Sequence, residues 1–299
     1  MNNFRKMKHG LLGFFVVLTI VGLTGMILAA GKFPVTIKDQ FNRTVKIDKA
    51  PLRIVSGSPS NTEILFALGL EQKVVGVTNW CNYPQAAQKV AKIGDISPLN
   101  VEKVLSLQPD LFIASNLNGE EAIAKLSELG VPVVAMNPMS FAQTLESITL
   151  IGKATGKDDQ AQAVVNKLKN TIKQVQKQGE AIKKRGLKVF ILLGWEPYWT
   201  AGPGSFLEEA VNLTGGENIA HDLGQSWGQM NFETVLSRNP DVIITDIDPE
   251  KLYSDKSWGG IAAIEKHQVY KIVGDEYYRP GPRLIEALND LVSLMAKSR

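Results

Sequence analysis

The chain has 299 residues, of which 44% are hydrophobic and 21% are charged, so it is a folded globular protein and not a disordered one. Its length allows one large core or two domain-sized cores. Arg5, Lys6 and Lys8 are the only charged residues before Lys32, and the rest of the chain carries thirty basic and thirty acidic residues. A neutral body of this kind argues against nucleic-acid binding.

Residues 1–30 resemble an export signal, because a basic start is followed by an uncharged apolar stretch. The stretch is also long enough to span a bilayer, so a cleaved signal peptide and a retained N-terminal anchor both remain open. Either one predicts a body in the periplasm or on the outer face of the cytoplasmic membrane. The tripeptide at 28–30 is typical of a lipoprotein signal, but Gly31 stands where the lipidated cysteine would be. We therefore expect no lipid anchor by the usual cysteine route.

Residues 31–156 are expected to form an N-terminal lobe. Alternating β-formers at 33–48 predict a hairpin, and a strand at 53–60 leads into a helix that ends at Gly69. Ser60 and Glu63 have the spacing of a capping box at the start of that helix. Further strands, alternating with helices, predict parallel βαβ units; the strands are expected at 73–78, 111–115 and 131–136, and the helices at 118–129 and 140–155.

Residues 157–186 contain no predicted strand and no proline, and their apolar residues keep helical spacing. They predict one long connecting helix. Residues 187–299 then repeat the earlier pattern as a C-terminal lobe. A strand at 188–194, an aromatic loop, and a helix capped by Ser205 come first, and a terminal helix begins at Leu284.

Two stretches of the chain repeat each other. Residues 100–115 and 231–246 are identical at eight of sixteen positions, and each predicts a short helix, a Pro-Asp turn and a strand. Such a repeat indicates two similar lobes with a ligand site between them. The repeat also provides one matched carboxylate in each lobe, Glu102 and Glu233. Each acid favours the start of its own helix, and the pair could also meet a two-fold-symmetric partner with basic sockets.

The candidate ligand contacts are eight aromatic residues and one arginine. Tryptophan and tyrosine side chains gather in predicted loops at strand ends, where open α/β sheets bind their ligands. The predicted contacts are Trp80, Tyr83, Trp195, Tyr198, Trp199, Trp227, Tyr277, Tyr278 and Arg279. The pattern predicts no catalytic residue, no cofactor and no metal site, since Cys81 is the only cysteine and His221 and His267 are far apart in sequence. We interpret Cys81 as a small apolar core residue.

The segments 53–84, 100–110, 158–185, 202–220 and 231–241 together resemble the substrate-binding proteins of ABC importers for cobalamin, haem and ferric siderophores, with the cobalamin binders closest. The resemblance implies a class III periplasmic binding protein fold, in which two Rossmann-like lobes are joined by a single long rigid helix. It also implies that Glu102 and Glu233 dock on arginines of a dimeric permease. Trp80 and Trp227 match positions that flank the corrin, and Ile96 stands where a cobalamin binder carries another aromatic residue.

The sequence therefore predicts a monomeric, non-enzymatic binding protein that delivers a corrinoid to an ABC permease with ATPase subunits. Cobalamin is the first-ranked corrinoid. A haem or ferric-siderophore binder of the same fold ranks second. An α/β enzyme and a membrane-anchored sensor domain rank below these two, because doubly wound lobes host many functions.

Overall fold

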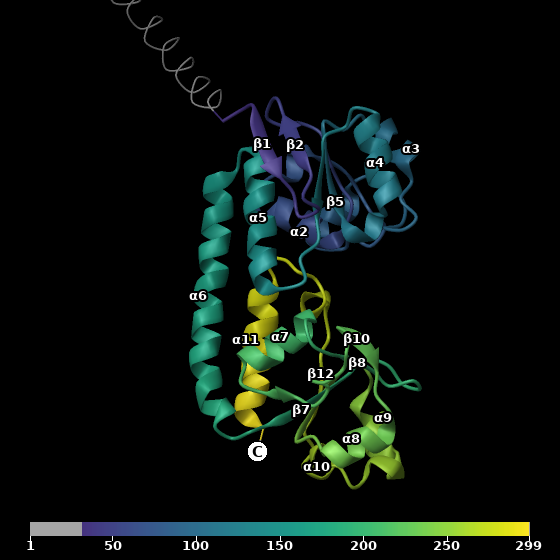
Figure 1. The fold of residues 1–299 in the computed structure, drawn as a ribbon, viewed down its shortest axis with the longest axis vertical. Helices are drawn as coiled ribbons and strands as arrows, with labels where there is room; N and C mark the ends of the chain where they lie inside the picture. Colours follow the sequence, from purple (N-terminus) through teal and green to yellow (C-terminus); the bar gives the residue numbers. More distant parts are fainter. Residues whose placement is uncertain (1–31, 299) are drawn as a thin grey trace, which may run out of the picture.

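A computed structural model describes residues 32–298 of the chain. The predicted leader at 1–30 lies outside the described residues. The described body consists of two lobes, one above the other, with a long helix along one side (Figure 1).

The N-terminal lobe begins with the predicted hairpin, in which β1 (Val35–Lys38) pairs antiparallel with β2 (Thr44–Ile47). A four-stranded parallel sheet in the order β4-β3-β5-β6 forms its centre. The strands are β3 (Ile54–Ser56), β4 (Val74–Val77), β5 (Leu111–Ser115) and β6 (Val133–Met136). The helices are α2 (Pro59–Ala67), α3 (Val101–Ser106), α4 (Glu120–Glu128) and α5 (Phe141–Thr155). The predicted βαβ alternation is confirmed.

The C-terminal lobe repeats this topology, because its parallel sheet has the order β12-β11-β7-β9, and each strand corresponds in chain order to one of the first sheet. The strands are β7 (Lys188–Leu192), β9 (Glu217–Asn218), β11 (Val242–Thr245) and β12 (Val269–Lys271). The helices are α7 (Phe206–Leu213), α8 (Phe232–Arg238), α9 (Pro249–Ser254), α10 (Ala262–Glu265) and α11 (Leu284–Lys297). The repeat at 100–115 and 231–246 forms α3 with β5 and α8 with β11.

Two segments predicted as loops contain regular structure. The aromatic loop after β7 includes β8 (Trp199–Ala201), which pairs antiparallel with β10 (Trp227–Gln229). The segment around Trp258 includes α9 and α10, and Trp258 is fully buried. These elements have only three to six residues, which is too short for a hydrophobic period to appear in the sequence.

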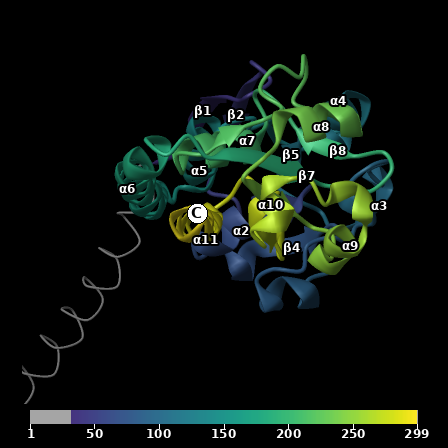
Figure 2. The same cartoon turned by 90° about the horizontal axis from the view of Figure 1, so that it is seen from below.

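The long helix α6 (Asp158–Lys183) has 26 residues and contacts both lobes, packing on α5 above and on α7 and α11 below (Figures 1 and 2). At 1.5 Å per residue it is roughly 40 Å long. One buried apolar cluster includes residues of both lobes and of α6, among them Ile64, Leu168 and Leu288. The two lobes and α6 therefore share one buried core.

Candidate ligand-binding cleft and docking helices

A cavity of about 360 Å³ lies between the lobes. Its N-terminal wall consists of the loops that follow the carboxyl ends of β3, β5 and β6, at 58–61, 115–117 and 136–139, together with Ile96. Its C-terminal wall consists of Trp227 and the segment 278–280. The carboxyl ends of parallel strands are where open α/β sheets bind ligands, so the cavity occupies the expected edge of the fold.

Two buried amides hold the N-terminal wall in place. Asn118, which is 2% exposed, donates through Nδ2 to the carbonyls of Gly57 (2.8 Å) and Ile96 (3.1 Å) and accepts through Oδ1 from the Ser115 amide (2.8 Å). Asn61 donates to the carbonyls of Ile113 and Ala114 at the end of β5. A Cβ atom on Gly57 would collide with Asn118 Oδ1, which explains why glycine occupies this position. The loops after β3 and β5 are therefore tied together.

Exposed aromatic rings lie on the C-terminal wall and beside it: Trp227 and Tyr278 line the cavity, and Trp199 does not. Trp199 and Trp227 lie on the two-stranded ribbon β8–β10, where Trp199 pairs with Gln229 and Trp227 pairs with Ala201. This register makes the two tryptophans diagonal neighbours on one face, and both are exposed. Tyr278 is 41% exposed. The partial burial of its side chain and the nearby Asp246 raise the pKa of its hydroxyl, so the side chain stays a neutral phenol.

Trp80 and Tyr83 lie at the rim of the cleft, on the loop after β4. Both are exposed, and neither lines the enclosed cavity. The Trp80 carbonyl accepts from Arg279 at 3.3 Å, so this rim residue adjoins the cavity wall. The Tyr83 ring lies 4.2 Å from the guanidinium of Arg283.

Three of the predicted contacts lie elsewhere. Trp195 and Tyr198 pack around the buried Trp258, with ring centroids 5.6 Å and 5.5 Å away. Phe232 at the start of α8 belongs to the same aromatic group, at 5.2 Å from Trp258. Tyr277 is 4% exposed and donates its hydroxyl to Asp290. These rings stabilise the C-terminal lobe, and the structure does not bring them to the cavity.

Arg279 does line the cavity, but both of its terminal nitrogens already have partners. It donates to Glu63 Oε1 (3.0 Å) and Asn82 Oδ1 (2.7 Å), and it pairs with Asp275 (2.9 Å). The prediction of a Ser60–Glu63 capping box is wrong, because Ser58 caps α2 and Glu63 is 3% exposed. Glu63 instead forms ion pairs with Arg279 and Arg283, which lie more than two hundred positions away in the sequence.

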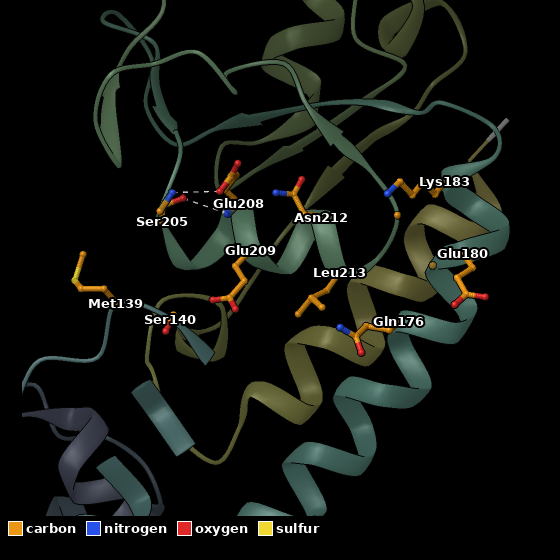
Figure 3. Close-up of a pocket in the computed structure, with 13 residues that line it drawn as sticks. Met139, Ser140, Gln176, Glu180, Lys183, Ser205, Glu208, Glu209, Asn212 and Leu213 are labelled. Carbon is orange, nitrogen blue, oxygen red and sulfur yellow. Dashed lines mark hydrogen bonds between the residues drawn. The ribbon is translucent and has the colours of Figure 1, made fainter. Parts of the chain in front are cut away.

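A second cavity, of about 620 Å³, lies beside α6 and α7 (Figure 3). Charged and amide side chains of the two helices line much of it, including Lys183, Glu180 and Asn212. Glu209 points from α7 toward the start of α5, where it accepts from the Phe141 amide at 2.8 Å. Burial raises the pKa of its carboxyl. This hydrogen bond joins the lobes. The second cavity lacks exposed aromatic rings and strand ends, so the smaller cavity is the better candidate for the ligand site.

The two copies of the repeat have matching local structure. Asn100 and Asn231 cap α3 and α8 by accepting from the amides of Lys103 (2.9 Å) and Thr234 (2.8 Å). In the turns that follow, Asp110 accepts from the Arg53 amide and Asp241 accepts from the Lys188 amide. These contacts tie each turn to the start of the first strand of the parallel sheet in its lobe, β3 or β7.

Glu102 and Glu233 lie in the first turn of these helices and are exposed. Within the part of the chain that the structure describes, neither carboxylate has a hydrogen-bond or ion-pair partner. The helix that carries Glu233 is further held by Arg238, which donates to both oxygens of Asp222 at 2.7 Å. These hydrogen bonds lower the pKa of Asp222 to about 2. Each lobe thus presents one acid from a well-anchored helix.

Cys81 is buried, as predicted, beside the hydroxyls of Thr62 and Thr78. Across residues 32–298, no group of three or more His, Cys, Asp or Glu side chains is arranged to hold a metal ion. The same residues contain no helix with the length and apolar character needed to cross a membrane.

Comparison with known proteins identifies the relatives of this chain. The profile of the periplasmic binding protein family matches residues 54–275. The ABC transporter substrate-binding lipoprotein YvrC of Bacillus subtilis is 40% identical over 267 residues, covering 87% of this chain and 84% of the relative. The vitamin B12-binding protein of Salmonella paratyphi A is 31% identical over 249 residues, with 82% and 90% covered. These relatives are binding proteins and not enzymes.

The crystal structure of the periplasmic vitamin B12-binding protein BtuF of Vibrio cholerae has a TM-score of 0.73 to this chain. It is 26% identical and covers 82% of this chain and 97% of its own. The predicted class III periplasmic binding protein fold is confirmed by this likeness.

The predicted localisation needs a correction. We expected a protein without a lipid anchor because Gly31 replaces the cysteine. The relative in Bacillus subtilis is a lipoprotein, which contradicts this expectation. The presence of Gly31 after residues 28–30 therefore does not exclude a lipid anchor.

The family profile covers most of the chain, and a relative at 40% identity covers still more. The chain therefore belongs to the periplasmic binding protein family and is the substrate-binding component of an ABC importer.

Proposed function

We propose that this protein captures a corrinoid in the cleft between its lobes and catalyses no reaction. Cobalamin is the first-ranked corrinoid. One observation carries the proposal: apart from Arg279, the cavity is lined by neutral groups. Its described walls combine amide and hydroxyl side chains (Asn61, Asn116, Asn137, Ser60 and Ser115) with apolar and aromatic ones. The one charged lining residue, Arg279, is already paired with carboxylates.

The chemistry of a corrinoid suits such a lining. The corrin ring offers broad apolar faces for aromatic side chains, and its rim carries neutral amide groups that hydrogen-bond with amides and hydroxyls. A corrinoid is larger than the enclosed 360 Å³ cavity, so the ligand also contacts the exposed rings at the rim. We assign this role to Trp80, Tyr83 and Trp199, and the role of inner contacts to Trp227, Tyr278 and Ile96.

Haem and ferric siderophores need charges that this cleft does not offer. Haem propionates and most ferric siderophores are anionic, and their carriers need unpaired cations. The sequence relative and the solved structure described above both bind vitamin B12. These observations favour a corrinoid over haem or a siderophore.

We further propose that the protein works as a monomer whose lobes, residues 31–156 and 187–299 joined by 157–186, each contribute one docking acid. Glu102 and Glu233 would pair with arginines on the two halves of a dimeric permease coupled to ATPase subunits. Their exposure, the lack of an intramolecular partner within residues 32–298 and the matching helices support this role.

The ligand assignment is tested by titrating the purified protein with cyanocobalamin, haemin and a ferric catecholate siderophore. Tryptophan fluorescence is a suitable signal because Trp80, Trp199 and Trp227 are exposed at the cleft. We expect saturable quenching with cyanocobalamin at micromolar concentration or below and weaker responses to the two anionic ligands. A saturable response to haemin or the siderophore without one to cyanocobalamin would overturn the assignment.

A further inference from the structure

Glu63 lies at the centre of an ion-pair network that crosses between the lobes. It belongs to α2 of the N-terminal lobe, and its partners belong to the segment that leads into α11 of the C-terminal lobe. Arg283 donates through Nε to Glu63 Oε2 (2.8 Å) and through Nη2 to Oε1 (2.8 Å), which is a bidentate pair. Arg279 adds a third hydrogen bond to Oε1 at 3.0 Å. A buried carboxylate thus receives two guanidinium groups.

The network contains more acids than bases. Asp275 pairs with Arg279 at 2.9 Å, and Glu276 pairs with Arg283 at 2.7 Å. Two guanidinium groups therefore meet three carboxylates, and Glu63 gives the network a net charge of −1. Each arginine would still have one acidic partner without Glu63. The nearby Asp246, which contributes to the raised pKa of Tyr278, adds a further negative charge to the same wall.

An entering anion would find few free donors in this network. Arg279 also donates to the Asn82 side chain and to the Trp80 carbonyl, and the guanidinium of Arg283 lies against the Tyr83 ring. A ligand carboxylate would have to displace Glu63 from its partners, and it would enter a negative field in a partly desolvated site. Both effects oppose binding of an anion.

We propose that Glu63 is a specificity-determining residue that excludes anionic ligands from the cleft. The proposal rests on the proposed function and extends it to a class of substrate: neutral or cationic corrinoids are accepted, and anionic corrinoids and anionic iron chelates are rejected. Arg279 lines the cavity and transmits this effect to the ligand, although Glu63 itself lies behind it.

The test uses ligands that match in shape and differ in charge. Cyanocobalamin is neutral at its amide rim, and hydrolysis of one propionamide gives monocarboxylate isomers with one negative charge. We expect the native protein to bind cyanocobalamin at least about tenfold more tightly than the isomer whose carboxylate faces the network. High salt should reduce this ratio, because the repulsion is screened.

Glu63→Gln keeps the shape and one acceptor oxygen while removing the charge. We expect the affinity ratio to fall to about threefold or less in this variant. Asp275→Asn is the second variant, and because Asp275 is partly exposed it keeps the test open if the buried substitution impairs folding. It should change the ratio in the same direction. Glu128→Gln, which alters an exposed acid on α4, is the control and should leave the ratio unchanged.

Two failures can be told apart. If cyanocobalamin binds and the ratio is the same in the native protein, Glu63→Gln and Asp275→Asn, the role of Glu63 is wrong and the ligand assignment stands. If cyanocobalamin does not bind the native protein at all, both proposals are wrong.

Discussion

Asn118 should be one of the most sensitive polar positions of the cleft. Its side chain makes three hydrogen bonds to backbone groups of three separate loops and is 2% exposed. Replacement by alanine leaves one amide and two carbonyls without partners. Each unsatisfied buried group costs about 1–3 kcal/mol. Water from the cleft can form hydrogen bonds with some of these three backbone groups and so reduce the cost.

We therefore expect Asn118→Ala to lower the free energy of unfolding by about 2–4 kcal/mol, a large share of the roughly 5–15 kcal/mol that a folded protein has. Urea unfolding, followed by circular dichroism, measures this change. Asn79→Ala is a matched control, because Asn79 is exposed and its one side-chain hydrogen bond goes to the side chain of Asp95. The control should change the free energy by no more than about 0.5 kcal/mol.

The same variant tests the role of Asn118 in the site. It holds the segments at Gly57, Ile96 and Ser115 in one arrangement, and all three segments contribute to the cavity wall. In the fraction that remains folded, affinity for cyanocobalamin should fall about tenfold, because the wall must be ordered on binding. A stability loss below about 1 kcal/mol would refute the view that these three hydrogen bonds hold the wall.

Three further predictions concern the docking acids, the aromatic residues and the Asp222 carboxylate. Replacing both Glu102 and Glu233 with alanine should leave ligand affinity within about twofold and abolish stimulation of the permease ATPase in proteoliposomes, whereas a large loss of affinity would place the acids in the cleft. Trp227→Ala should weaken cyanocobalamin binding about tenfold or more, and Tyr277→Phe should lower the melting temperature without changing affinity. Asp222→Asn should lower the melting temperature above about pH 4. Because the pKa falls from 3.8 to about 2 on folding, the difference from the native protein should vanish as the pH drops to about 2.

The overall fold follows from the sequence to a large extent. Long buried strands such as 111–115 and the helical spacing of 158–185 are strong local signals, and both predictions agree with the structure within two residues. The ribbon β8–β10 was missed, because its pairing joins segments more than twenty residues apart and neither segment shows alternation. Local patterns cannot reveal an element whose stability comes from a distant partner.

The site is less accessible to sequence reasoning. Loop position selected Trp227 and Tyr278, which line the cavity, but it could not separate them from Tyr277, which is buried in the core. Glu63 had the spacing of a capping residue, and only the fold brings it to Arg283. The amides that hold the wall, Asn61 and Asn118, carry no motif. Their burial is what marks these two amides as structural, and burial can be seen only in the folded chain.

The internal repeat gives the strongest physical argument about the docking acids. Most of the polar positions that its two copies share have a clear structural use. The asparagines cap helices, and the serines Ser106 and Ser237 donate to carbonyls of the preceding turn. The aspartates accept from backbone amides at the start of the first parallel-sheet strand in each lobe, β3 or β7. The shared prolines end the helices before the turns.

Glu102 and Glu233 differ from these neighbours in one respect. Their contribution to the helix dipole is worth a few tenths of a kcal/mol to about 1 kcal/mol, and in residues 32–298 they contact no partner that would require a glutamate. An aspartate or an uncharged residue at the same position would serve the fold nearly as well. Two acids at matching places, one on each lobe, are what a symmetric pair of basic sockets on a permease requires.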